Sequence, residues 1–140
     1  MTAVLLAACG KPEAPAADPE ESAPVELLVW CEPDDTAGFE ERAAVFCAEN
    51  TETEYRIIVM AESLDTVCDT VLTDPSSAAD VFAYPEESSS LLLEAGVLQQ
   101  REDGSCGVPF RDGVLLGVNR HGTDPEAAEQ LADVLSGRGA

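Results

Sequence analysis

Acidic and aromatic side chains gather directly after an apolar run near the start of this sequence of 140 residues. Trp30 stands near the end of the run 25–31, and Glu32, Asp34 and Asp35 follow it. Aromatic rings cover the C–H faces of sugars, while carboxylates accept hydrogen bonds from sugar hydroxyls. The same side chains suit a cationic ligand such as a polyamine, through charge and cation–π contacts. We therefore interpret these four residues as candidate ligand-binding residues.

A second group follows a later apolar run, 79–84. Tyr84 ends this run, Glu86 comes two positions later, and Arg111 is the cation we expect nearby. In open α/β sheets a ligand binds beyond the carboxyl ends of the strands, so both groups would meet there if both runs are parallel strands. Tyr84, Glu86 and Arg111 therefore complete the candidate set.

The same residues also have structural interpretations, which the sequence leaves open. Asp34 or Asp35 could cap the first helix, and Glu86 could cap the third. Trp30 could belong to the core. Arg111 could pair with the adjacent carboxylate or with a helix acid.

The sequence predicts no catalytic residue, metal site or cofactor. The single histidine, His121, lies in the turn-like segment 119–122, and no Cys, Asp or Glu around it has metal-site spacing. The serine run 88–90 has no partnered base, and no phosphate-binding Gly-rich loop is present.

Cys31 provides one enzymatic alternative. The segment 30–33 superficially resembles a thioredoxin-like redox site, in which a thiol of low pKa attacks disulfides. The resolving cysteine would fall at position 34, which is Asp34, and a neighbouring carboxylate raises a thiol pKa. A redox module using Cys31 and a surface interaction module therefore remain as alternatives to a binding protein.

Apolar periodicity predicts the elements that position these residues. The runs 25–31, 55–60 and 79–84 predict strands, and a helix is expected over 88–95. Such alternation predicts an α/β fold with a parallel sheet covered on both faces, as a three-layer α/β/α structure. Two segments between the strands have apolar residues at helical spacing and therefore predict helices. The apolar residues are Phe39, Ala43, Phe46 and Cys47 in the first segment, and Leu64, Val67, Cys68, Val71 and Leu72 in the second.

The second half has a looser pattern. Residues 99–107 predict a loop, 108–112 lead into a strand over 113–119, and Asp124 caps a final helix that ends before Gly137. We expect the last strand to run antiparallel to the others. The apolar face of the final helix holds Ala128, Leu131, Ala132 and Leu135.

The net charge limits the classes of binding partner, and the cysteine content limits the possible disulfides. The chain has 28 acidic and 7 basic residues, a net charge of −21, which excludes nucleic acid and disfavours anionic membrane surfaces as partners. Outside the cytoplasm Cys31, Cys47, Cys68 and Cys106 could form disulfides in three full pairings. Because Cys47 and Cys68 lie on apolar stripes, we favour them as small buried hydrophobic residues.

The first residues resemble a bacterial lipoprotein signal. The motif Leu6-Ala7-Ala8-Cys9 looks like a lipobox, in which small residues precede a cysteine that receives lipid. We interpret 1–8 as a truncated signal remnant, Cys9 as the lipidation site, and 9–24 as a disordered acidic Pro/Ala tether. Residues 25–140 then form a single folded lobe. No membrane-spanning run is present, so the lipid would anchor the chain at the cell surface or in the periplasm.

The order of these segments resembles the bacterial extracellular solute-binding proteins, the maltose-binding-protein-like lipoproteins that deliver ligands to ABC importers. The strand 25–31, the helix that starts at Phe39, the segment 79–84 and the segment 92–98 look like consecutive parts of that family's pattern. The resemblance implies a periplasmic-binding-protein-like lobe that binds a small solute, a sugar or a cation such as a polyamine. It also implies an ABC transporter permease as partner, a monomeric state and no chemistry.

Length is where the sequence departs from this family, whose members have two lobes and several hundred residues. Segments 113–119 and 124–135 look most like the part where the chain returns from the second lobe, so that 99–112 replaces the middle of a usual member. The alternative is that 108–119 is the first crossing into a second lobe. Either interpretation predicts one lobe and half of a usual ligand cleft.

Overall fold

The computed structural model describes residues 24–101 and 104–137. The predicted signal remnant 1–8, Cys9 and the tether up to residue 23 lie outside the described residues. The described chain forms one five-stranded sheet with the strand order β2-β1-β3-β5-β4. Its strands are β1 (Val25–Cys31), β2 (Tyr55–Ala61), β3 (Val81–Pro85), β4 (Val108–Arg111) and β5 (Val114–Val118).

The sheet is mostly parallel with one reversed strand. β1 pairs in parallel with both β2 and β3, whereas β5 runs antiparallel to β3. β4 runs antiparallel to β5, so it points in the same direction as the first three strands. The predicted parallel sheet with an antiparallel last strand is confirmed.

The sequence pattern does not predict β4, since residues 108–112 were expected only to lead into the next strand. The strand has only four residues, and Pro109 cannot donate a hydrogen bond to a neighbouring strand. Proline is tolerated at the edge of a sheet, and β4 is an edge strand. Asp112 and Gly113 form the turn to β5, in which Gly113 has a φ of 78° that favours glycine.

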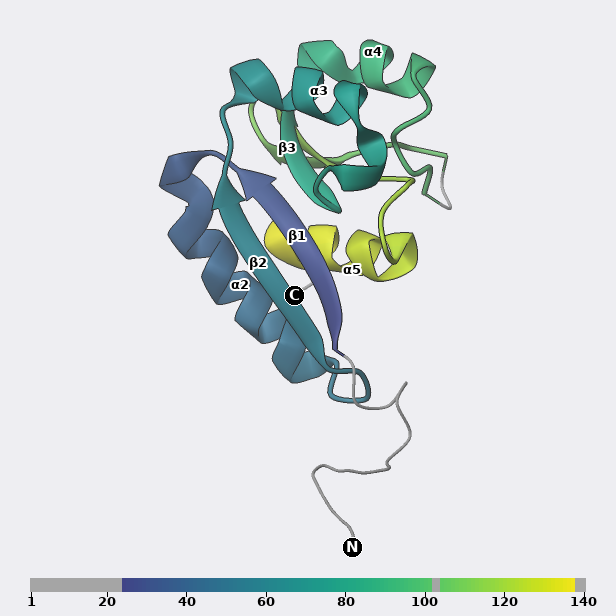
Figure 1. The fold of residues 1–140 in the computed structure, drawn as a ribbon. Coiled ribbons are helices and arrows are strands. Elements are labelled where there is room, and N and C mark those ends of the chain that lie inside the picture. Colours follow the sequence, from purple (N-terminus) through teal and green to yellow (C-terminus); the bar gives the residue numbers. More distant parts are fainter. Residues whose placement is uncertain (1–23, 102–103, 138–140) are drawn as a thin grey trace, which may run out of the picture.

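Helices cover both faces of the sheet and make three layers (Figure 1). The apolar sides of α2 and α5 share one core with the sheet, and those of α3 and α4 share a second core on the other face. The predicted α/β/α layering is therefore confirmed. The helices are α2 (Thr36–Glu49), α3 (Leu64–Thr73), α4 (Ser89–Glu94) and α5 (Pro125–Leu135), with short 3-10 turns at Pro33–Asp35, Pro75–Ser77 and Glu86–Ser88.

Alternation along β1 divides its side chains between the two cores. Leu27, Val29 and Cys31 are buried under α2 and α5, while Leu28 and Trp30 pack against the core beneath α3. The final helix begins as the sequence predicts, because the Asp124 carboxylate accepts a hydrogen bond from the amide of Ala127 at 3.2 Å.

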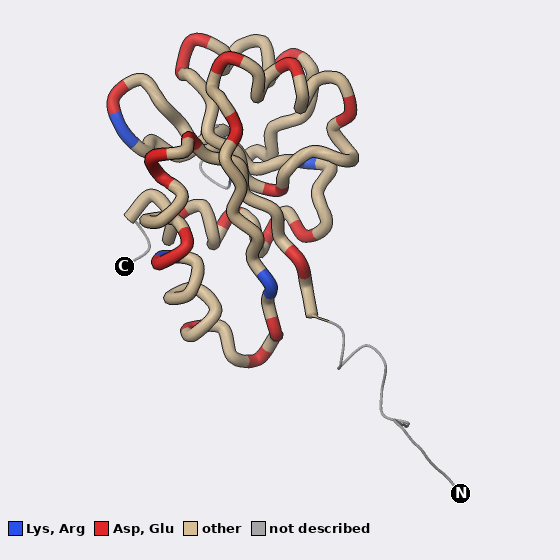
Figure 2. The backbone as a smooth tube through the Cα atoms, turned by 60° about the vertical axis from the view of Figure 1, so that its left-hand side comes forward, with Lys and Arg blue, Asp and Glu red and all other residues tan. Residues whose placement is uncertain are grey.

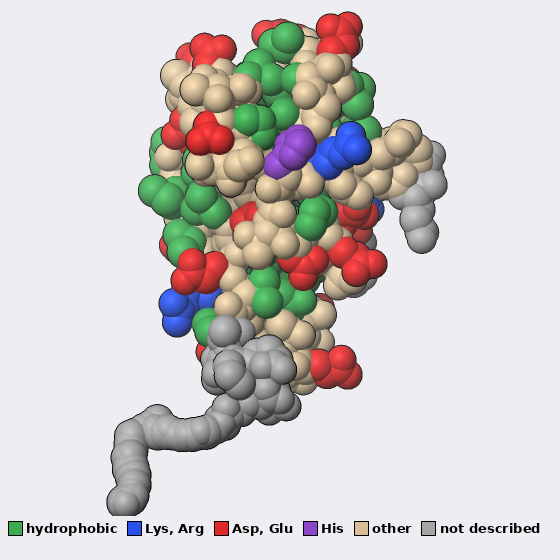
Figure 3. All heavy atoms as spheres, turned by 45° about the vertical axis from the view of Figure 1, so that its right-hand side comes forward, with side chains coloured by type: hydrophobic (Ala, Val, Ile, Leu, Met, Phe, Trp, Pro, Cys, Tyr) green, Lys and Arg blue, Asp and Glu red, His purple; other side chains and the backbone are tan. Residues whose placement is uncertain are grey.

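Charged groups lie mainly on the outside of this lobe. Acidic residues are spread along helices and loops on several sides, and basic residues occupy few positions (Figure 2). Apolar side chains are visible at the end that carries α4, where Leu91 and Leu93 are about half exposed (Figure 3). Among the described residues, no helix has both the length and the apolarity to cross a bilayer.

Candidate functional site

The candidate site lies where β1 and β3 end side by side. After β1 the chain passes to α2 on one face of the sheet, and after β3 it passes to α4 on the other face. Chain paths that diverge from adjacent parallel strands leave a crevice at their carboxyl ends, where ligands bind in open α/β folds. Glu32 and Asp35 lie in the connection after β1, and Glu86 lies in the connection after β3.

Arg111 joins this edge from the last residue of β4. Its Nη1 donates to Oδ1 and Oδ2 of Asp35 at 2.9 and 2.8 Å, and its Nη2 donates to Oε1 of Glu32. One guanidinium thus bridges two predicted site carboxylates. Of the structural alternatives for Arg111, a pair with the adjacent carboxylate is not among its contacts, whereas a pair with a helix acid is found, because Asp35 is the N-cap residue of α2.

The guanidinium packs over the ring of Phe110, which in turn contacts the ring of Phe39. The Cζ atom of Arg111 lies 5.2 Å from the ring centroid of Phe110, within cation–π range. The Phe110 ring meets the ring of Phe39, on α2, edge to face at 5.0 Å. The apolar stripe of α2 therefore positions the charged group, although Phe39 itself is buried.

Burial changes the pKa of one carboxylate at this edge, that of Asp35. The pKa of Asp35 is raised above its ordinary value, first by burial and then by the neighbouring Asp34 carboxylate, while Arg42 opposes the rise. The Asp35 side chain is 16% exposed, whereas that of Arg111 is 42% exposed. The guanidinium is therefore the accessible partner, held by a more enclosed carboxylate.

The capping roles considered for the acids are not found. Asp35 occupies the N-cap position of α2, but its side chain makes no capping hydrogen bond, because Arg111 holds it. Asp34 and Glu86 are exposed, and neither occupies an N-cap position. Both carboxylates are therefore accessible beside the bridge.

The two aromatic candidates have different surroundings. Trp30 is half-buried and packs against the core beneath α3, so that part of it remains exposed and its binding role stays a prediction. Tyr84 is fully buried, and its ring packs 5.9 Å from that of Phe82. Burial within the second core is the physical reason why the prediction that Tyr84 offers a ring face to a ligand is wrong.

Cys31 does not have the surroundings of a redox thiol. It is 1% exposed, and its pKa is raised to about 12, first by burial and then by Asp35 and Glu40. A reactive thiol needs a lowered pKa and access to solvent. The thioredoxin-like alternative therefore has no support at this position.

The four described cysteines are unpaired. Cys68 is buried as expected, whereas Cys47 is half-buried with its thiol 3.6 Å from the carbonyl oxygen of Tyr55. His121 is exposed in a turn, with Nε2 3.2 Å from the carbonyl oxygen of Gly96. Among residues 24–101 and 104–137, no group of three or more His, Cys, Asp or Glu side chains could hold a metal ion.

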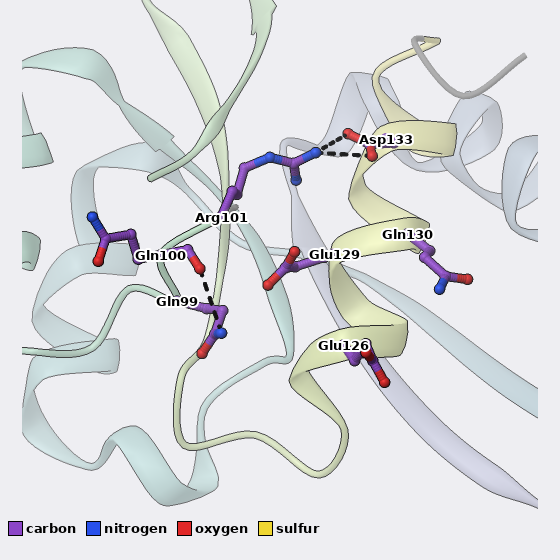
Figure 4. A pocket seen from close by; sticks show the side chains of 7 residues that line it. All are labelled: Gln99, Gln100, Arg101, Glu126, Glu129, Gln130 and Asp133. Atoms are coloured by element: carbon purple, nitrogen blue, oxygen red, sulfur yellow. Dashed lines mark hydrogen bonds and ion pairs between the residues drawn. The ribbon is translucent and has the colours of Figure 1, made fainter. Parts of the chain in front are cut away.

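Sequence reasoning missed a second polar region, at a different place in the fold. Arg101 binds both carboxylate oxygens of Asp133 on α5 at 2.9 Å, beside a hollow of about 610 Å³ (Figure 4). Only the spacing of polar residues along α5 hinted at a common surface there. Nothing in the sequence indicates that the loop around residue 101 packs opposite it.

Comparison with solved structures bears on the fold. A structure described as "with acarbose" matches with a TM-score of 0.53 and 16% identity, covering 67% of this chain and 29% of that chain. At this identity the similarity concerns the fold alone. The lobe holds the Glu32–Arg111–Asp35 bridge at the ends of its parallel strands.

Two further solved structures resemble the lobe less closely. One is a cyclo/maltodextrin-binding protein complexed with maltotetraose, with a TM-score of 0.47, 22% identity, and coverage of 59% of this chain and 22% of that chain. The other is a maltodextrin-binding protein from L. casei BL23 without ligand, with a TM-score of 0.49, 16% identity, and coverage of 67% and 28%. This chain thus spans less than a third of the length of each of these three proteins. No protein-family model and no curated protein matches it.

Proposed function

We propose that this lobe reversibly binds a small solute, a sugar, at the edge of the sheet where β1 and β3 end. The observation that carries the proposal is the guanidinium of Arg111 bridging Glu32 and Asp35 at that edge. Guanidinium donors and carboxylate acceptors are complementary to neighbouring hydroxyl groups. The role is binding without chemistry, and the similar fold of the structure described as "with acarbose" supports it.

A cationic ligand such as a polyamine is the second candidate. Four carboxylates, those of Glu32, Asp34, Asp35 and Glu86, surround this edge, and Arg111 compensates only part of their charge. Excess negative charge concentrates cations near a surface. Dependence on salt separates the two ligands, because binding of a polyamine weakens as ionic strength rises and binding of a neutral sugar does not.

Calorimetric titration of the full chain with maltotetraose, and separately with spermidine, tests the proposal. We expect one of the two ligands to bind and to raise the melting temperature, because a ligand that binds only the folded state stabilises it. Arg111→Met should abolish the heat with maltotetraose but strengthen binding of spermidine, because it removes the cation that compensates the carboxylates at this edge. Glu41→Gln, on the exposed surface of α2, should leave the heat unchanged. Absence of both heat and stabilisation with either ligand would exclude a solute site at this edge.

We also propose that the chain is a lipoprotein that delivers its solute to the permease of an ABC importer from the cell surface or periplasm. Support comes from the lipobox-like motif that ends at Cys9 and from the acidic segment before β1. Growth of the source cells with a palmitate analogue should label the wild-type chain. Cys9→Ser should remain unlabelled, and label retained in this variant would contradict lipidation at Cys9.

A further inference from the structure

The strand β2 forms an open side edge of the sheet (Figure 1). It is the outermost strand in the order β2-β1-β3-β5-β4, and it pairs in parallel with β1 in an unbroken register. The carbonyl of Glu54 accepts a hydrogen bond from Val25, and the amide of Glu62 donates one to Cys31. Because alternate residues of a strand bond to the same neighbour, the even-numbered residues of β2 bond to β1. The N–H and C=O groups of the odd-numbered residues in 55–61 therefore point outward, where no described strand pairs with them.

The side chains of β2 leave this edge unprotected. Natural edge strands usually carry prolines, bulges or several charges that prevent pairing with another chain, but the seven residues of β2 include one charge, Arg56, and no proline. Ile58 and Met60 are 40% and 50% exposed. They lie in register with Leu28 and Trp30 of β1, on the face that carries α3. An exposed apolar row beside unpaired backbone groups is typical of a surface that accepts another strand.

One end of the edge is already occupied. The thiol of Cys47, on α2, lies 3.6 Å from the outward carbonyl oxygen of Tyr55. The ring of Phe46 also packs against the ring of Tyr55, with centroids 5.1 Å apart. We therefore expect an added strand to use the outward groups that follow Tyr55.

The side of α2 nearest this edge has small residues. Arg42 marks the opposite side of the helix, because its Nη1 donates to the carbonyl oxygen of Leu135 on α5 at 2.6 Å. Cys47 marks the side nearest the edge, and Ala44 lies one turn before it and is exposed. Small side chains leave room for a second helix at the usual separation of about 8–10 Å. An α2 from another copy can therefore lie beside this one.

The outward groups suit a second copy of β2. Two copies related by a two-fold axis pair their edge strands antiparallel. With the axis through Val59, the two Val59 residues exchange hydrogen bonds, and Ile57 exchanges hydrogen bonds with Ala61 of the second copy. This register uses the three outward residues that follow the occupied end.

The same register matches the side chains on the α3 face. Residues that lie opposite each other then have numbers that add up to 118, which places Ile58 opposite Met60 of the second copy. It also places Arg56 opposite Glu62 of the second copy. Each dimer therefore gains two apolar pairs and two pairs of opposite charge, and such cross-strand pairs stabilise a sheet.

Both charged groups already face the required side. Arg56 binds Glu26 of β1 at 3.1 Å, and its side chain is 61% exposed. The Glu62 carboxylate accepts from the hydroxyls of Thr66 and Thr70 on α3, at 3.2 and 3.4 Å. Because a guanidinium has five N–H donors, Arg56 can keep Glu26 and also bind a carboxylate of the second copy.

Neighbouring registers match less well. An axis through Ile58 needs the outward groups of Tyr55 and places Glu54 opposite Glu62 of the second copy. An axis through Met60 places Ile58 opposite Glu62 of the second copy. Like charges or a charge against an apolar side chain destabilise such pairs, so of these three registers the first alone is complementary.

We propose that this chain associates with a second copy through β2, in a two-fold dimer that joins the two five-stranded sheets and pairs Arg56 with Glu62 of the second copy. This dimer departs from the monomeric state that the family resemblance implies. It does not depend on the proposed solute site, because Arg111, Glu32 and Asp35 take no part in it. The net charge of −21 on each chain opposes contact, so the association is weak.

Sedimentation velocity of the full chain tests the proposal. In about 0.15 M salt, where repulsion between distant charges is screened, we expect the mass to rise from one chain at about 5 µM to two chains at about 500 µM. The mass of one chain over this whole range would overturn the proposal.

Exchange of the paired charges tests the register. Arg56→Glu and Glu62→Arg should each weaken self-association at least about tenfold, because like charges then meet twice in each dimer. An equimolar mixture of the two variants should associate again, since each offers the charges that the other lacks. Arg120→Glu, in the exposed turn after β5, should associate as the wild type does. Unchanged association of both single variants, or a mixture that stays monomeric, would contradict the proposed pairing.

Ala61→Pro tests the backbone contacts separately. Ala61 is exposed, and proline at an edge position removes the outward N–H while leaving the bonds to β1 in place. Thermal unfolding should show a folded variant, and sedimentation should show weaker association; a folded variant that associates like the wild type would disprove pairing through β2. Arg111→Met should leave association unchanged, so failure of the solute site is distinguished from failure of the dimer.

Discussion

Arg111 and Asp35 are 76 positions apart in the sequence, and the guanidinium of one binds both carboxylate oxygens of the other, at 2.9 and 2.8 Å. The pair ties the β4–β5 hairpin to the connection after β1. Between these two segments lies β3, so the pair spans the edge at which the solute is proposed to bind. Because Nη1 is held by Asp35 and Nη2 by Glu32, the guanidinium is fixed at two nitrogens, which orients it more firmly than a single contact would.

Removal of this guanidinium should affect binding more than stability. Arg111→Met should lower the free energy of unfolding by only about 0.5–1 kcal/mol, because the side chain is 42% exposed and solvent screens the pair. Urea unfolding measures this change. As a control, Arg56→Met removes a single contact to Glu26 between side chains that are 61% and 56% exposed, and its effect should be smaller. A larger loss in the control would contradict the bridging role of Arg111.

Asp80 should be far more important for stability than the surface acids. Its carboxylate is buried and accepts from the backbone amides of Leu28 at 2.8 Å and Thr123 at 2.9 Å. Asp80→Ala leaves two amides without acceptors and should lower the free energy of unfolding by about 3 kcal/mol. Asp69→Ala, on the exposed surface of α3, should change it by less than about 0.5 kcal/mol. Chemical denaturation of both variants measures the difference, and equal effects would disprove this role of Asp80.

Cys31 should make stability fall in alkaline solution. In the folded state its pKa is about 12, against an ordinary value of 9.0, so the unfolded chain loses the thiol proton first. The folded state therefore loses stability relative to the unfolded state as the pH rises from 9 towards 12, by at most about 1.4 kcal/mol per pH unit.

Comparison with Cys31→Ser isolates this titration, because all other groups are shared. Between about pH 8 and about pH 10, the free energy of unfolding of the wild type should fall more than that of Cys31→Ser. Urea titrations under reducing conditions at both pH values measure it. A difference that stays constant with pH would show that the thiol is not protected by burial.

Gly117, on β5, should not tolerate a methyl group. A Cβ there would lie 2.8 Å from Cδ2 of Leu98 and 2.8 Å from Cε1 of Tyr84, both inside the second core. Gly117→Ala should therefore destabilise the fold by about 1–3 kcal/mol through overpacking. Gly38, in α2, has no atom within 4 Å of the equivalent position, so Gly38→Ala should stabilise by about 0.5–1 kcal/mol. Thermal unfolding of the two variants should give opposite shifts.

Local pattern alone determined most of the architecture. The apolar run 25–31 is β1, the stripe from Leu64 to Leu72 lies on α3, and the Asp124 cap begins α5. These features are readable because burial on one face of a helix or strand imposes its period on nearby residues. The alternation of elements also implied the three layers and the edge at which Glu32 and Asp35 lie.

Contacts between distant segments were decided only by the tertiary structure. The sequence could not show that Arg111 pairs with Asp35, that Tyr84 is buried, or that Arg101 meets Asp133. Charged and aromatic side chains can contact partners at many sequence separations. Neither the periodicity nor the spacing of residues indicates which of these partners lies close in the folded chain. Burial of apolar side chains determined the three-layer arrangement. The packing of these layers then determined which polar groups lie together at the sheet edge and which lie together at the hollow beside α5.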